Sequence, residues 1–178
     1  AVYDASPEAL QQLRDVAVKT NKKLAEKLGI KQSAAVTCVK PSGTVSQLVD
    51  AASGIHARHN PFYIRTVRGD NKDPLTMFMK DKGVPAEPDF TAPDSVTVFS
   101  FPMKSPDHAI TRYSLSAIEQ LELWLKIADN YCEHKPSVTI SVKENEWLEV
   151  GSWCWDHFDS LSGISFLPFS DHSYKQAP

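Results

Sequence analysis

The sequence predicts an α/β fold in which helices and strands alternate along the chain. Segments with apolar residues three and four positions apart predict helices, and shorter segments between them predict strands because they alternate or are continuously apolar. Residues suited to N-caps precede the helical segments, and glycines follow several of them. With about five elements of each kind, the usual arrangement is a set of parallel strands covered by helices.

The first predicted helix begins after Ser6 and ends before Gly29. Serine is a favoured N-cap, Pro7 suits the first helical position, and glycine is favoured just beyond the last one. Its expected apolar face consists of Leu10, Leu13, Ala17, Leu24 and Leu28.

Two segments in the middle of the chain, 62–68 and 95–101, alternate with period two and are predicted to be strands. Arg65 and Arg68 make the first segment more polar than a buried strand. We therefore expect the two segments to form a peripheral antiparallel pair instead of joining the buried parallel strands.

Between these two strands, Asp73-Pro74 predicts the start of a helix of about ten residues that ends near Gly83. The proline-rich stretch 84–94 then predicts a surface loop.

The last third of the chain predicts two further helices and two further strands. Ser116 and Glu119 have the spacing of a capping box, and the helix they open has an apolar stripe of Ile118, Leu121, Leu125, Ala128 and Cys132. Segments 136–142 and 164–168 predict strands. The helix between them has an expected apolar face of Trp147, Val150, Cys154 and Phe158.

Composition and charge exclude several classes of partner. The formal net charge is −3 and the basic residues are spread along the chain, so neither a nucleic-acid duplex nor an anionic membrane is expected to bind. No apolar run approaches the length of a membrane span. Cys38, Cys132 and Cys154 are widely separated, which favours a reducing, cytoplasmic location. The first and last residues suggest a segment cut from a longer chain.

The sharpest local signal is the stretch CVKPSGTVSQLV (38–49). The run 34–39 predicts a buried strand, and a short helix is expected from near Thr44 to Gly54. Backbone amides at such a helix start can bind an anion, and glycine lets a phosphate approach the backbone. The candidate site consists of Pro41, Ser42, Gly43, Thr44, Val45 and Ser46. An ordinary capped turn that binds nothing is the alternative, since the stretch has no Walker-type lysine.

Other chemistry-bearing residues have simpler interpretations. A solvated loop and strand face is favoured for His56, Arg58, His59, Arg65 and Arg68. The cysteines are expected to fill apolar positions. Helix packing is expected for Trp147, Trp153 and Trp155. The adjacent Asp171, His172 and Ser173 are poorly placed for a hydrolytic triad.

Three separated stretches carry a family resemblance: 38–75, 133–153 and 162–178. Together they resemble the C-terminal part of the catalytic chain of ribonucleotide reductase, most closely the adenosylcobalamin-dependent class. The resemblance implies an α/β fold that is part of a ten-stranded barrel, with 34–39, 137–142 and 164–168 among the last barrel strands. Residues 1–178 would then form a single partial domain.

The resemblance also implies a role for the candidate site. Loop 41–46 would hold the phosphates of a ribonucleoside di- or triphosphate. The full-length enzyme would use adenosylcobalamin and a thioredoxin-type reductant, with no cofactor expected on this segment. In reductases that import their radical from a second subunit, two adjacent tyrosines lie in the last barrel strand. Ser165 and Phe166 stand here instead, which favours the cobalamin-dependent class.

The family's thiyl-radical cysteine lies in an Asn-x-Cys-x-Glu pattern, which this sequence lacks. No cysteine is therefore assigned a catalytic role, no metal ligand is assigned, and the chain is expected to be a non-catalytic fragment. An incomplete barrel could pair with the remainder of the reductase chain or with a second copy. Two alternatives stay open: a stand-alone nucleotide- or phosphate-binding module, and a small hydrolase built around His172 or His59.

Overall fold

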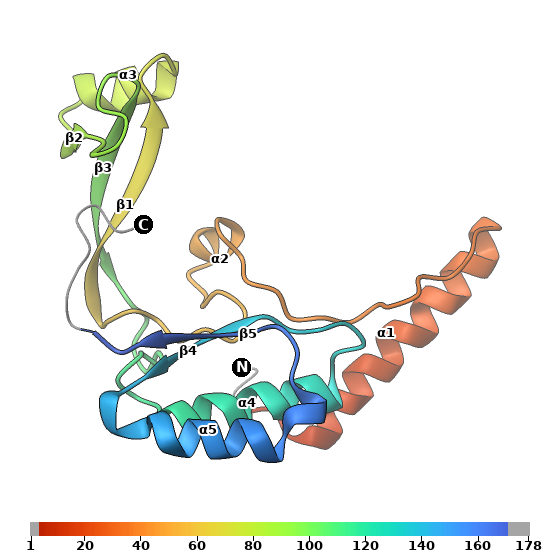
Figure 1. Ribbon diagram of the computed structural model, residues 1–178. Helices are drawn as coiled ribbons and strands as arrows, with labels where there is room; N and C mark the ends of the chain where they lie inside the picture. The colour runs from red at the N-terminus through yellow and green to blue at the C-terminus, as the bar shows by residue number, and fades with distance from the viewer. Residues whose placement is uncertain (1–3, 171–178) are drawn as a thin grey trace. The chain divides into compact units, whose positions relative to one another are not determined.

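The computed structural model describes residues 4–170, which divide into two compact units (Figure 1). Of the described residues, the first unit contains 4–58 and 110–169, and the second contains 59–109 and 170. The prediction of a single partial domain over 1–178 stays a prediction.

The first unit opens with helix α1 (Pro7–Leu28), as predicted. The Ser6 hydroxyl accepts a hydrogen bond from the Ala9 amide at 3.2 Å, and Gly29 ends the helix in the left-handed conformation with φ +68°. The expected apolar face is only partly buried. Leu10 is buried, whereas Leu13, Leu24 and Leu28 are exposed.

A parallel strand pair forms the centre of the first unit. Strand β4 (Val138–Val142) pairs with β5 (Ile164–Pro168), with Val138 opposite Ile164. The chain crosses between them through α5 (Trp147–Asp156) and two short 3-10 turns, Glu144–Glu146 and Phe158–Ser160. This confirms the parallel arrangement predicted for these two strands.

Helix α4 (Ala117–Asn130) runs beside α5 along one side of the strand pair (Figure 1). Its capping box is present: the Ser116 hydroxyl accepts from the Glu119 amide, and the Glu119 carboxylate accepts from the Ser116 amide at 2.7 Å. Hydrogen bonding to the Glu119 carboxylate, first from the Ser116 amide and then from the Ser116 side chain, lowers the pKa of this carboxyl.

The core lies between these two helices and β4. Its buried members are Ala117, Leu121, Trp124, Val138, Ile140, Val142, Val150 and Trp153. Trp124 is buried on α4 although the predicted stripe did not include it, and the predicted Ile118, Leu125 and Ala128 are partly buried against the same core. On α5, Trp153 packs as expected, but Trp155 is 81% exposed. Phe158, in the 3-10 turn that follows α5, is also exposed.

The predicted strand at 34–39 is absent. The segment is extended, yet only Thr37 in it is buried. Its backbone hydrogen bonds go to the Glu133 carboxylate and to the amides of Glu133 and His134. Because these partners belong to the turn after α4 and not to a neighbouring strand, no ladder forms.

The second unit is a three-stranded antiparallel sheet in the order β1-β3-β2. Strand β1 (Phe62–Asp70) pairs with β3 (Val96–Lys104), which confirms the predicted antiparallel pair. Helix α3 (Pro74–Asp81) starts at the Asp73 cap, as expected. The stretch predicted as a loop contains β2 (Ala86–Pro88), a short edge strand where prolines at both ends are tolerated.

The α/β class is therefore confirmed, with a parallel pair in one unit and an antiparallel sheet in the other. The ten-stranded barrel stays a prediction. Within residues 4–170, none of the helices has both the length and the apolar content needed to traverse a lipid bilayer.

Candidate phosphate-binding loop

The candidate loop 41–46 connects the extended segment 34–40 to α2 (Val45–Leu48). This helix is a single turn, shorter than the predicted helix that closes at Gly54. Its N-cap, Thr44, makes no side-chain capping bond. A single turn has little macrodipole, so any anion here would depend on individual amides and hydroxyls.

The amides of Ser42 and Ser46, which were among those expected to face an anion, are bonded within the described chain. The Ser42 amide donates to the Ser53 hydroxyl at 2.8 Å, and the Ser46 amide donates to the Ser42 hydroxyl at 3.0 Å. The Ser46 hydroxyl in turn donates to the Ser42 carbonyl at 2.8 Å and is buried. Ser42 and Ser46 therefore shape the loop, and the sequence-based expectation that their amides face a ligand is wrong for this conformation.

The amides of Thr44 and Val45 differ from those two. Neither has a hydrogen-bond partner among residues 4–170, and both residues are exposed at the tip of the loop. The Thr44 hydroxyl is likewise unbonded within the described chain. These groups are the donors that the loop presents outward.

The structure requires glycine at position 54 but not at position 43. Gly54 has φ +64°, and a β-carbon there would meet the Lys40 carbonyl oxygen at 3.0 Å, so glycine is required by conformation and by close approach. Gly43 is not at positive φ, and a β-carbon there would meet nothing within 4 Å. Since packing does not require glycine at 43, its missing side chain is available for close approach by a ligand.

A chain of hydrogen bonds fixes the loop against strand β4. Ser53, which binds the Ser42 amide, also accepts at its carbonyl from His56 Nδ1 at 2.9 Å. His56 Nε2 accepts from the Thr139 amide at 3.1 Å. These two bonds require the tautomer with the proton on Nδ1. His56 is therefore a positioning residue, which corrects the expectation that it lies on a solvated loop.

The charged side chains near the loop make ion pairs or hydrogen bonds within the first unit. Arg58 is only 6% exposed and donates to the Asp50 carboxylate at 2.9 Å, which corrects the expectation that it is solvated. Asp50 follows α2 in the left-handed region, with φ +49°. Lys40 Nζ donates to the Ser137 hydroxyl at 3.2 Å and remains exposed. Lys40 is thus the cation on the loop side that a phosphate could recruit.

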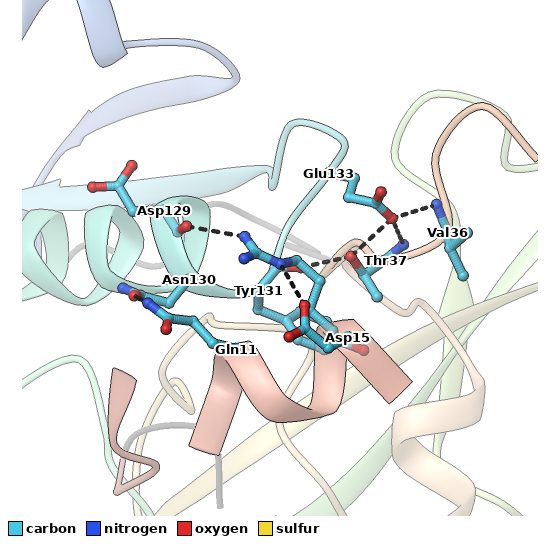
Figure 2. A network of polar contacts seen from close by, with 9 residues as sticks. Gln11, Asp15, Val36, Thr37, Asp129, Asn130, Tyr131 and Glu133 are labelled. Atoms are coloured by element: carbon cyan, nitrogen blue, oxygen red, sulfur yellow. Dashed lines mark hydrogen bonds and ion pairs between the residues drawn. The ribbon is translucent and has the colours of Figure 1, made fainter. Parts of the chain in front are cut away.

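The segment that leads into the loop is held by polar contacts at the end of α4 (Figure 2). The Glu133 carboxylate accepts from the amides of Val36 and Thr37 at 2.9 and 3.3 Å. The Thr37 hydroxyl donates to the Tyr131 carbonyl at 2.5 Å. The approach to residue 41 is therefore anchored from α4, while its far side is anchored through His56.

The remaining candidates are not gathered into a site. Arg68 pairs with Asp89 in the second unit, and residues 4–170 contain no group of three or more side chains that could hold a metal ion. Asp171, His172 and Ser173 lie outside the described residues.

Comparison with known proteins bears on the family. No protein-family model matches the chain. Two curated relatives are adenosylcobalamin-dependent ribonucleoside-triphosphate reductases: one from Lactobacillus gasseri, 29% identical over 99% of this chain, and one from Euglena gracilis, 30% identical over 95%. A solved structure of a B12-dependent class II ribonucleotide reductase matches 96% of this chain with a TM-score of 0.78 and 28% identity.

The chain is similar to part of the cobalamin-dependent ribonucleotide reductases. This confirms the resemblance found in the sequence motifs. The chain spans about a quarter of the length of each of these relatives, 24% in all three cases.

Proposed function

We propose that this chain is a segment of an adenosylcobalamin-dependent ribonucleotide reductase and forms the C-terminal part of its ten-stranded barrel. The observation that carries the proposal is the similarity along nearly the whole chain, in sequence and in structure, to enzymes of this one class. The parallel pair of β4 and β5, covered by helices, is consistent with two neighbouring strands of such a barrel.

Loop 41–46 is proposed to hold the phosphates of the nucleotide substrate. The unbonded amides of Thr44 and Val45 supply donors, Gly43 has no side chain that could block a ligand, and Lys40 supplies a positive charge. Since the curated relatives are ribonucleoside-triphosphate reductases, the triphosphate is the favoured substrate.

The remaining parts of the reaction are proposed to lie in the rest of the reductase. Adenosylcobalamin supplies radical chemistry in this class, and no residue of this chain is assigned to it. The thiyl-radical cysteine is likewise assigned to the rest of the reductase chain. A thioredoxin-type reductant would act on that part of the enzyme. The segment by itself is expected to bind nucleotide weakly in a cytoplasmic setting and to catalyse nothing.

The phosphate proposal is tested by titrating the chain with a ribonucleoside triphosphate and following the amide NMR signals of Thr44 and Val45. We expect these signals to shift, and Gly43→Asp to weaken binding about tenfold or more, because its carboxylate would repel phosphate. Gly151→Asp is the matched control. Gly151 also has open space around its α-carbon, but it lies on α5, so binding should be unchanged.

Equal affinity of the wild type and Gly43→Asp would rule out the loop as the site. The fragment proposal has a separate readout, the assay of deoxyribonucleotide formation with adenosylcobalamin and a dithiol. We expect no turnover. Measurable turnover would overturn the fragment proposal, because it would show that this chain holds all the catalytic residues.

A further inference from the structure

Two of the three cysteines lie on either side of one backbone contact. The Thr37 carbonyl accepts hydrogen bonds from the amides of Glu133 and His134 at 3.0 and 3.3 Å. Cys38 directly follows Thr37, and Cys132 directly precedes Glu133. The two cysteines therefore flank a direct backbone contact, and a disulfide requires such proximity because its α-carbons lie roughly 4.4–6.8 Å apart.

Side-chain contacts fix the same two positions from both directions. The Cys38 thiol donates to the Lys135 carbonyl at 3.5 Å, and the Thr37 hydroxyl bonds the Tyr131 carbonyl (Figure 2). The Cys132 amide donates to the Ile127 carbonyl at 3.2 Å, which holds this cysteine at the end of α4. Both cysteines therefore occupy defined backbone positions within a single unit.

The two thiols also interact with each other. Burial raises the pKa of the Cys132 thiol, and the neighbouring Cys38 thiol raises it further. Cys154 lies apart from this pair on α5, where burial alone raises the pKa of its thiol. Cys38 and Cys132 are both only partly buried, so a small reagent can reach them.

We propose that Cys38 and Cys132 form a reversible disulfide by exchange with a low-molecular-weight disulfide. This pair is a modification site separate from loop 41–46, and the proposal does not depend on nucleotide binding.

The exchange proceeds in two balanced steps. The Cys38 thiolate attacks one sulfur of the small disulfide, forms a mixed disulfide and releases one small thiolate. Cys132 then loses its proton to solvent and attacks the Cys38 sulfur, which forms the protein disulfide and releases the second small thiolate. Two protein thiols are oxidised and one small disulfide is reduced to two thiols. The raised pKa of Cys132 makes it the poorer first nucleophile, so it is assigned the second attack.

The bond would tie the segment entering loop 41–46 covalently to the end of α4. In a reducing compartment such a bond is transient, so its formation would report oxidising conditions. Because the two cysteines are far apart in sequence, the cross-link also restricts the unfolded chain strongly.

The test is incubation of the folded chain with oxidised glutathione, followed by alkylation of remaining thiols and peptide mass spectrometry. We expect a cross-linked peptide pair containing Cys38 and Cys132, one alkylated cysteine at 154, and full reversal by dithiothreitol. The oxidised chain should also unfold at a temperature higher by about 5 °C or more.

Serine variants distinguish the first attack, assigned to Cys38, from the second attack, assigned to Cys132. Cys132→Ser should trap a stable glutathione adduct on Cys38, because the thiol that resolves it is missing, whereas Cys154→Ser should behave as the wild type. The same treatment in urea should give all three cysteine pairings. A wild-type chain that keeps three alkylatable thiols, holds glutathione on Cys38, or links another pair in the folded state would overturn the proposal.

Discussion

The two units differ in what they bury. The first encloses large apolar side chains completely, among them Trp124, Leu121 and Ile140, between two helices and a parallel strand pair. Among the described residues of the second unit, the buried apolar side chains are Val98 and Phe99, both on its central strand β3. One unit is therefore stabilised mainly by packing, and the other depends more on its strand ladder and local polar contacts.

Asp89 shows how the second unit compensates for its small core. Its carboxylate is buried and accepts from the Thr91 hydroxyl and amide at 2.6 and 2.9 Å, and from Arg68 Nε at 2.8 Å. These bonds, with Thr91 contributing most, hold the pKa of the Asp89 carboxyl well below its ordinary value of 3.8. Buried apolar side chains thus stabilise the first unit, whereas a hydrogen-bonded buried carboxylate contributes to the stability of the second.

The largest effect is expected from Trp124→Ala in the first unit. It removes a fully buried side chain and the hydrogen bond from its indole nitrogen to the Pro136 carbonyl at 3.1 Å. Cavity formation should lower the free energy of unfolding by about 3–5 kcal/mol. Urea denaturation followed by tryptophan fluorescence measures this, since all four tryptophans of the chain lie in the first unit.

Trp155→Ala is the matched control, because this tryptophan is 81% exposed on α5. A change within about 0.5 kcal/mol is expected. Similar losses for the two variants would contradict the assignment of the core to one face of α5 and α4.

A smaller, pH-dependent effect is expected in the second unit. Since the folded-state pKa of Asp89 is depressed, its contribution to stability is complete above the ordinary pKa and is lost as the pH falls below it. The protection of β3 amides against hydrogen exchange, taken relative to the intrinsic exchange rate at each pH, should therefore fall below about pH 4 in the wild type.

Asp89→Asn should exchange faster at neutral pH and lose this acid dependence, since the carboxylate that pairs with Arg68 is gone. Core amides of β4 serve as the internal reference. If the variant keeps the wild-type pH profile at β3, another carboxylate governs the acid sensitivity of this unit.

The smallest effect is expected from Gly151→Ala in the interior of α5. Gly151 is exposed, its φ is not positive, and a β-carbon there would meet nothing within 4 Å. Alanine should raise the free energy of unfolding of the first unit by about 0.5–1 kcal/mol, since it restricts the unfolded chain and favours the helix. If the thermal or urea midpoint does not rise, the structure requires glycine at position 151.

Features encoded by neighbouring residues were predictable from the sequence. The Ser6 and Ser116 caps and the glycine stop at 29 depend on contacts within a few residues, so local chemistry determines them. The local apolar pattern around Ile140 and Phe166 was enough to predict strands there. The position of loop 41–46 between an extended segment and a helix start was determined in the same way.

Contacts between distant parts of the chain were decided by the tertiary structure. Residues 34–39 have strand-like composition, but Thr37 bonds the turn after α4 and leaves no ladder. Ser53 and His56 fill hydrogen-bonding positions at the loop and at β4 that no local pattern reveals. The physical reason is that a backbone amide takes whichever acceptor folding brings to it. The sequence determined where the loop lies, and the tertiary structure decided which of its amides remain unbonded.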